Sequence, residues 1–224
     1  MAIGLNLLFG LPLLVGVCVT VLDVMLILAL QSRGFRCLEA VVIGLVALIG
    51  VSFGAQLLWL QPPIAAVLGG FIPSARIVTN PEMLYLAVGI VGATVMPHNL
   101  YLHSAIVQTR RHDRTLAGTR QAIRFATADS TLALALALFV NAAILIVAAG
   151  ALNRPGEAPV TEIADAYRLL SPVLGVAIAS AVFGVALLAS GLSSSVTGTL
   201  AGQIVMEGFL EIRLSPATRA FLTA

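Results

Sequence analysis

Five long apolar stretches constrain the fold of this chain more than any other feature. A helix needs about 20 consecutive apolar residues to cross the hydrocarbon core of a bilayer, and each stretch is long enough. The 224-residue chain is 59% apolar and only 10% charged, so it lacks the polar surface of a soluble domain. The sequence therefore predicts a single all-helical membrane domain, with spans at about 11–31, 37–60, 83–108, 123–152 and 172–192.

Two segments outside these stretches are too short or too polar to cross a bilayer. Residues 2–9 are apolar and are followed by Gly10 and Pro12, which end helices, so they resemble the last turns of a helix. Residues 193–224 predict a loop followed by a short interfacial helix. An apolar start without a basic region is not a secretion signal, and we expect the chain to be part of a longer protein.

The basic residues are distributed unevenly among the loops. All twelve are arginines, and nine lie on the side that follows the first, third and fifth stretches. The positive-inside rule places those nine in the cytoplasm, so we expect a cytoplasmic C-terminus. The all-arginine, alanine-rich composition fits a high-GC bacterium and predicts an integral protein of the bacterial inner membrane. A net charge of +2 is too small to indicate a nucleic-acid partner.

The third apolar stretch contains an interruption. Pro97 lies at its centre, with Gly92 before it and His98 after it. Proline has no N–H and clashes with the preceding turn, so we expect the helix to break there. The break would leave the carbonyls of Ala93 and Thr94 without intrahelical donors. In a membrane such carbonyls are tolerated only against protein or a water-filled cavity, and interrupted helices form ion sites in secondary transporters.

Met96 directly precedes this proline. Calcium and magnesium prefer hard oxygen ligands, whereas a thioether prefers softer transition metals. Free carbonyls beside Met96 therefore predict a site that favours manganese, iron, cobalt or cadmium over calcium. The alternative is that Met96 only fills space between helices, as most methionines do. The proline and the two histidines of the same stretch favour the ligand interpretation.

Two histidines lie in the second half of this stretch. His98 and His103 are five residues apart, which rotates their directions by about 140° around a helix, so they do not chelate one ion together. We expect His98 near the break and His103 nearer the cytoplasm, in a proton pathway or a gate. The alternative for either residue is a neutral histidine that hydrogen-bonds between helices.

Other polar residues lie within the apolar stretches. Asp23 is in the first and is expected in a polar network, with a proton role as the alternative. Asn141 is in the middle of the fourth and is expected in interhelical hydrogen bonds, with a position at the same cavity as Met96 as the alternative. Asp129, near the start of the fourth, is expected to pair with an arginine. Residues 189–202 are rich in small side chains, which suit close helix packing and a hinge.

The Nramp divalent metal transporters have a sixth-helix signature that the third stretch closely resembles. The resemblance lies in Gly92-Ala-Thr-Val-Met-Pro-His-Asn-Leu-Tyr-Leu-His-Ser104. It extends in both directions: residues 2–13 are similar to the third helix running into the fourth, and residues 34–39 to the entry of the fifth. Residues 190–208 resemble the transport signature after the eighth helix. Essentially the whole chain is covered.

The resemblance implies part of a LeuT-like fold with inverted repeats. It also implies transport of Mn²⁺ or Fe²⁺ coupled to protons, with no resident cofactor and no enzymatic activity. By position, Met96 and the carbonyl of Ala93 match metal ligands of the family, and His98 and His103 match histidines tied to proton coupling. The implied partners are the lipid bilayer, the metal ion and the remaining helices of the transporter.

This chain departs from the family pattern by omission. The Asp-Pro-Gly-Asn motif of the first helix, the acidic residues of the third and the glutamine of the tenth do not occur in it. We therefore expect that these residues alone do not transport. An alternative function is a non-transporting membrane sensor or scaffold that keeps the fold. An intramembrane metalloenzyme is disfavoured, because the histidines lack chelating spacing and no general base is seen.

Overall fold

A computed structural model describes residues 1–31, 35–108, 112–113, 115–153 and 160–208 of the chain. Within these residues all regular secondary structure is helical. The helices are α1 (Ala2–Phe9), α2 (Leu13–Gln31), α3 (Phe35–Leu60), α4 (Ile64–Gly70), α5 (Arg76–Thr79), α6 (Pro81–Thr94), α7 (Pro97–Gln108), α8 (Leu116–Leu152), α9 (Ile163–Leu174) and α10 (Ala179–Gly208).

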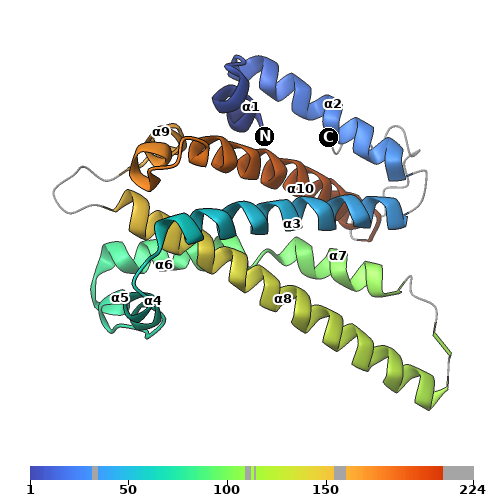
Figure 1. Ribbon diagram of the computed structural model, residues 1–224. Helices are drawn as coiled ribbons and strands as arrows, with labels where there is room; N and C mark the ends of the chain where they lie inside the picture. The colour runs from blue at the N-terminus through green and yellow to red at the C-terminus, as the bar shows by residue number, and fades with distance from the viewer. Residues whose placement is uncertain (32–34, 109–111, 114, 154–159, 209–224) are drawn as a thin grey trace.

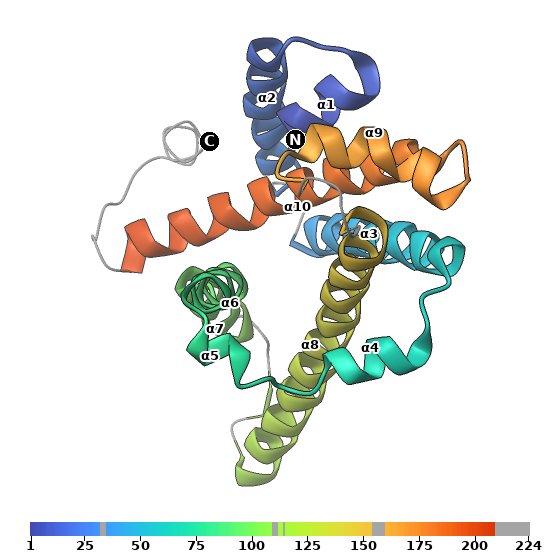
Figure 2. The ribbon, with the colours of Figure 1, turned by 90° about the vertical axis from the view of Figure 1, so that its left-hand side faces the viewer.

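Helix α10 is the central element of the fold. It lies between the α1–α2 pair and α3 in both views of the molecule (Figures 1 and 2), and it also packs against α7 and α9. Helix α3 packs on its other side against α8. The interrupted pair α6 and α7 is therefore attached to the bundle mainly through α7, because the principal neighbour of α6 is α5.

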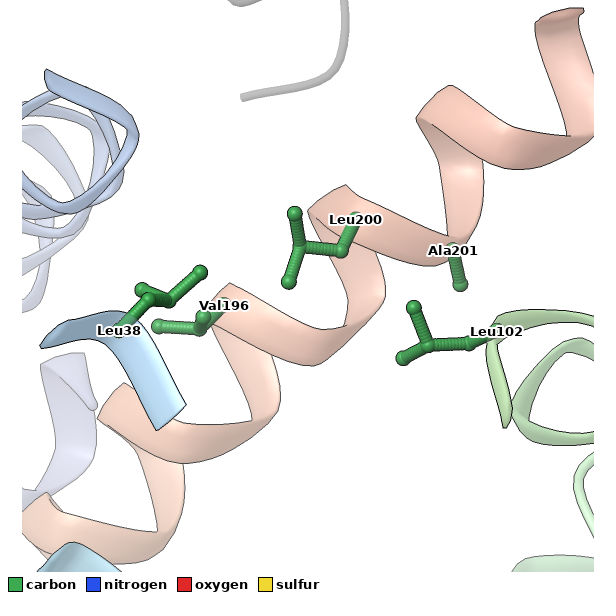
Figure 3. Packing of buried hydrophobic residues seen from close by; sticks show 5 residues of the cluster. All are labelled: Leu38, Leu102, Val196, Leu200 and Ala201. Carbon is green, nitrogen blue, oxygen red and sulfur yellow. The ribbon is translucent and has the colours of Figure 1, made fainter. Parts of the chain in front are cut away.

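A small hydrophobic cluster joins three helices at one end of the bundle. Leu102 of α7 packs against Leu200 and Ala201 of α10, and Leu38 of α3 packs against Val196 of α10 (Figure 3). All five side chains are buried. Close packing of this kind holds membrane helices together, because lipid is as apolar as the side chains and removal from water contributes little there.

Two further clusters join α3, α8, α9 and α10. Phe53 lies edge-on to Phe183, with ring centroids 6.3 Å apart, and packs with the buried Ala143 and Ala186. The rings are in the T-shaped geometry that aromatic pairs prefer. The third cluster lies beyond them towards the α9 end of the bundle and consists of Val147, Ala151 and Leu170.

Three described helices are long and apolar enough to cross a membrane, namely Cys37–Leu60, Leu116–Leu152 and Ala179–Met206. Two shorter segments, Leu13–Asp23 and Pro81–Thr94, are apolar as well. These segments support the predicted all-helical membrane class. Most of the arginines used to predict the orientation lie outside the described residues.

The structure corrects the expectation for the C-terminal third of the chain. The predicted span at 172–192 is divided: α9 ends at Leu174, Gly175 follows with a left-handed φ of 66°, and α10 begins only at Ala179. The predicted loop and interfacial helix at 193–224 is wrong as far as Gly208, because α10 continues to that residue. Residues 209–224 lie outside the described residues.

Side-chain hydroxyls explain why the polar run stays helical. Ser195 donates to the carbonyl of Gly191 (2.9 Å), Thr197 to that of Ser193 (3.0 Å) and Thr199 to that of Ser195 (2.8 Å). A hydroxyl that bonds the carbonyl four residues back is satisfied within its own helix. The small polar residues therefore do not need water, and the sequence signal for a loop is misleading.

Two other boundaries differ from the sequence expectation. The fourth stretch was expected to begin at residue 123, but α8 begins at Leu116 because the Thr115 hydroxyl caps it by accepting from the N–H of Gly118 (3.1 Å). The short helices α4 and α5 occupy the connection between α3 and α6, where the sequence indicates only turn residues. Neither of these short helices is long enough to cross a bilayer.

Candidate functional site at the interrupted helix

The third apolar stretch forms two helices separated by a short extended link. Helix α6 ends at Thr94, Val95 has φ −93° and ψ 90°, and α7 begins at Pro97. The two helices follow one another on either side of this link in Figure 1. The last bond of α6 runs from the N–H of Val95 to the carbonyl of Val91 (2.8 Å). Only Val95 and Met96 therefore lie between the helices.

Local chemistry accounts for the position of the link. Pro97 has no N–H, so the carbonyl of Ala93 has no donor four residues further along. A residue that precedes proline is also driven out of the helical region, which applies to Met96. The Thr94 hydroxyl donates to the carbonyl of Ile90 (2.8 Å) and so satisfies itself within α6. The link thus presents the Ala93 carbonyl and the Met96 thioether as available ligand atoms.

Gly92 lies inside α6 and not in the link. It is the third residue from the end of the helix, and a Cβ there would meet nothing within 4 Å. Its small size is therefore not required by any neighbour among the described residues. The interruption coincides with Pro97, the first residue of α7, and a role of Gly92 in the break stays a prediction.

Met96 and Ala93 are accessible at the link. Met96 is 40% exposed, and Ala93 is exposed as well. Among the described residues there is no group of three or more histidine, cysteine, aspartate or glutamate side chains that could hold a metal ion. The donor atoms at the link itself are a thioether and a carbonyl, which form a soft, low-charge donor set.

The start of α6, the helix that precedes the link, is capped. The Asn80 side chain accepts hydrogen bonds from the N–H groups of Glu82 (2.9 Å) and Met83 (3.3 Å), and Pro81 occupies the first helical position. An asparagine cap followed by proline is a strong helix start, because it satisfies donors that the helix leaves free. Helix α6 therefore has a defined beginning as well as a defined end.

Helix α7 is anchored on one side and contacts α8 on another. Leu102 is buried against α10, and Ile106, one turn further, packs against the same cluster. His103 is exposed, and its Nε2 lies 3.0 Å from the hydroxyl oxygen of Ser130 in α8. This contact brings together a residue that the sequence singles out and a serine that it does not.

The remaining predicted site residues are distributed over other helices. His98 is the second residue of α7, and its side chain, like that of Pro97, lies outside the described part of the structure. Asn141 is exposed on α8, whose principal neighbours are α3 and α9 and not α6. Asp23 lies on α2, and its Oδ2 atom is buried without a hydrogen-bond partner. The described structure therefore does not gather Asp23 and Asn141 around the link.

A cavity of about 1010 Å³ lies beside the ends of α7 and α8. Its lining includes Val107 from α7, His112 and Asp113 from the connection, and Gln121, Phe125 and Asp129 from α8. Gly118 also lines it, and a Cβ at this position would meet the carbonyl oxygen of Asp113. The cavity lies on the side of the molecule where the sequence analysis places the cytoplasm.

Sequence reasoning missed two polar residues that the structure makes conspicuous. Ser130 was passed over, although the run Asp129-Ser130-Thr131 in an apolar stretch is a usable signal. Gln56 in α3 is fully buried, and among the described residues neither its amide nitrogen nor its amide oxygen has a hydrogen-bond partner. A glutamine within an apolar span is the signal that could have found it.

Comparisons with known proteins agree with these observations. The family model described as natural resistance-associated macrophage protein-like (Nramp) matches residues 1–224. The chain is 62% identical over 222 residues to the divalent metal cation transporter MntH of Xanthomonas campestris and 60% identical to that of Bradyrhizobium diazoefficiens. Each match covers 99% of this chain, and the chain spans about half the length of these relatives, 50% and 49%.

Solved structures give the same result for the fold. A crystal structure of a mutant of the Eremococcus coleocola manganese transporter superposes with a TM-score of 0.81 at 38% identity. The same transporter in complex with an aromatic bis-isothiourea substituted compound superposes with a TM-score of 0.79 at 39% identity. Each match covers 99% of this chain and 48% of the solved chain. The predicted all-helical membrane fold class is confirmed by this similarity.

Proposed function

The chain belongs to the Nramp family, and we propose that the protein containing it transports manganese or iron(II) across a membrane, driven by a proton gradient. It is an integral membrane protein, with helices of the length and composition that cross a bilayer. Its relatives are named divalent metal cation transporters, which supports a carrier and not an enzyme. The metal ion is the substrate in this proposal, and no resident cofactor is required.

The observation that carries the proposal is the link between α6 and α7. Its available ligand atoms are the thioether sulfur of Met96 and the carbonyl oxygen of Ala93, a residue whose usual donor position is occupied by Pro97. A thioether favours manganese, iron, cobalt or cadmium over calcium. Two ligands are too few for a complete site, so the proposal requires further ligands from other helices of the protein.

The two halves of the interrupted helix are supported differently. Leu102 holds α7 on the central helix α10, whereas the described residues of α6 are exposed or half-buried and rest mainly against α5. In secondary transporters one repeat moves against the other around a site built from interrupted helices. The fixed packing of α7 on α10 is consistent with such a site at the link.

Protons enter this scheme through the histidines of α7. His98 is the second residue of α7, next to the link. His103 lies five residues further along the same helix and contacts Ser130. Histidine changes its charge within the physiological range, which suits an ion-coupled carrier. The arginine distribution supports a cytoplasmic C-terminus, and the bacterial relatives support location in the bacterial inner membrane.

The proposal is tested by metal uptake into proteoliposomes that contain the product of the complete reading frame that includes residues 1–224. An inward proton gradient is expected to accelerate Mn²⁺ uptake, and a protonophore to abolish the acceleration. Met96→Ala is expected to lower uptake at subsaturating Mn²⁺ about tenfold, the loss that corresponds to about 1.4 kcal/mol of binding. The same substitution is expected to let Ca²⁺ compete, because the soft ligand is gone.

Met83→Ala is the matched control. Met83 lies in the first turn of α6 and has the same exposure as Met96, 40%, but it is remote from the link. Its replacement is expected to leave uptake and selectivity unchanged. An equal loss in both variants, or Mn²⁺ uptake that ignores the proton gradient, contradicts the proposal.

A further inference from the structure

We propose that Ser130 is a positioning residue for His103: its hydroxyl oxygen accepts a hydrogen bond from the Nε2–H group of the imidazole and so fixes the tautomer and the ring orientation. The inference rests on the proposed function in one respect, because it concerns a histidine assigned to proton coupling. The observation is the distance of 3.0 Å between the two side-chain atoms, which belong to α7 and α8.

The contact is a direct connection between two helices that otherwise pack little against each other. In the described part of the chain, the principal neighbour of α7 is α10, whereas α8 packs against α3 and α9. Leu102 fixes the adjacent position of α7 on α10, and Ala143 fixes α8 against Phe53 of α3. Both backbones are therefore held independently, and the distance between His103 and Ser130 reports how α7 lies relative to α8.

Neighbouring hydroxyl groups bond within their own helices. Ser104 donates to the carbonyl of Leu100 (2.7 Å), and Thr131 donates to the carbonyl of Thr127 (2.7 Å). Each hydroxyl is satisfied within its own helix, as is usual for serine and threonine in helices. Ser130 lies beside Thr131, but its hydroxyl oxygen lies within hydrogen-bond distance of an imidazole on another helix.

Hydrogen-bond chemistry selects the direction of the bond. A neutral imidazole has one nitrogen that donates and one that accepts, and a protonated imidazole has two that donate. If Nε2–H donates to Ser130, a proton binds and leaves at Nδ1 while the contact at Nε2 remains unchanged. If Ser130 donated instead, protonation would fall on Nε2 and reverse the bond. Only the first direction keeps the ring in place through a cycle of protonation and deprotonation.

The structural part of this inference is tested without transport. The product of the complete reading frame is prepared with ¹⁵N-labelled histidine and studied in lipid bilayers by solid-state NMR at a pH where the ring is neutral. The His103 signals are those that disappear in His103→Gln. We expect the shifts of an Nε2–H tautomer and a through-space contact to the Cβ of Ser130. In Ser130→Ala we expect the His103 signals to shift and broaden.

The functional part is tested with a double-mutant cycle on proton-driven Mn²⁺ uptake. Ser130→Ala is expected to lower the rate about fivefold, the ratio expected for one net hydrogen bond. In a His103→Gln background it is expected to lower the rate no further, and Ser130→Thr is expected to retain most of the rate. Ser104→Ala, a serine next to the histidine that bonds its own helix, is the matched control and is expected to have no effect.

The outcomes separate the two proposals. An Nδ1–H tautomer, or His103 signals that Ser130→Ala leaves unchanged, overturns the positioning role even if transport is proton-coupled. Equal effects of Ser130→Ala in the presence and absence of His103 also overturn it. If the NMR contact is found but Mn²⁺ uptake does not respond to protons, the proposed function fails and the positioning of the ring by Ser130 stands.

Discussion

The Nε2 atom of His103 lies 3.0 Å from the hydroxyl oxygen of Ser130, although 27 positions separate the two residues in the chain. The contact joins the second half of an interrupted helix to α8, and it is absent from any local pattern in the sequence. It therefore links the helix interruption, which local chemistry explains, to the packing of the bundle, which local chemistry does not explain.

The first prediction concerns the residue that ends the interruption. Pro97→Ala supplies an N–H that can reach the carbonyl of Ala93, so the helix is expected to close across Val95 and Met96. Mn²⁺ uptake is expected to fall at least tenfold (about 1.4 kcal/mol), while the thermal unfolding temperature stays equal or rises. Pro81→Ala is the control, because a proline at the first helical position only reinforces a helix start and its loss leaves uptake unchanged. Retained uptake in Pro97→Ala would disprove the role of the link.

A second prediction concerns the buried amide of Gln56. This side chain is 0% exposed, and both polar atoms lack a hydrogen-bond partner in the part of the chain that the structure describes. An unpartnered buried amide destabilises the fold, so Gln56→Leu is expected to raise the free energy of unfolding by about 1 kcal/mol. Gln56→Ala is expected to lower it by about 2 kcal/mol, because it leaves a cavity. Thermal unfolding in detergent measures both variants, and equal destabilisation by both would show that the amide has a partner.

A third prediction concerns a glycine in the first turn of α8. A Cβ at Gly118 would meet the carbonyl oxygen of Asp113, a backbone atom that cannot rotate away. Gly118→Ala is therefore expected to lower the free energy of unfolding by about 1 to 3 kcal/mol. Gly44→Ala in α3 is the control: nothing lies within 4 Å of a Cβ there, and alanine favours a helix over glycine by about 1 kcal/mol. The unfolding temperature is thus expected to fall in Gly118→Ala and to rise in Gly44→Ala. A shift in the same direction for both variants would contradict the prediction.

A fourth prediction concerns the corner between α9 and α10. The Ser171 hydroxyl oxygen accepts from the N–H of Ser180 (3.0 Å) and the hydroxyl donates to the carbonyl of Ala177 (3.0 Å). Ser171→Ala removes both bonds and leaves an uncapped helix start, so the free energy of unfolding should fall by about 1 to 2 kcal/mol.

The control for that corner is Ser190→Ala, an exposed position on α10. It is expected to change the free energy of unfolding by less than about 0.5 kcal/mol. Both variants are compared by thermal unfolding in the same detergent. If Ser171→Ala changes the free energy of unfolding as little as the control does, the two hydrogen bonds of the Ser171 hydroxyl have no stabilising role.

The helical class and the main apolar helices could be predicted because they depend on composition over about 20 residues. The extent of the last helix could not. Residues 193–208 contain enough serine, threonine and glycine to indicate a loop, yet they form the second half of α10. Whether a hydroxyl bonds water or the carbonyl four residues back depends on what surrounds the helix, and Val196, Leu200 and Ala201 are buried there against α3 and α7.

The candidate site shows the same division. The helical class, the family and the chemistry available at Met96, Ala93 and Pro97 follow from the sequence, because a thioether, a carbonyl and a missing N–H are properties of single residues. Three relationships required the folded chain: His103 meets Ser130, Gln56 is enclosed, and Asn141 lies on a helix whose principal neighbours exclude α6. They depend on how whole helices pack, and packing is set by side chains far apart in the chain.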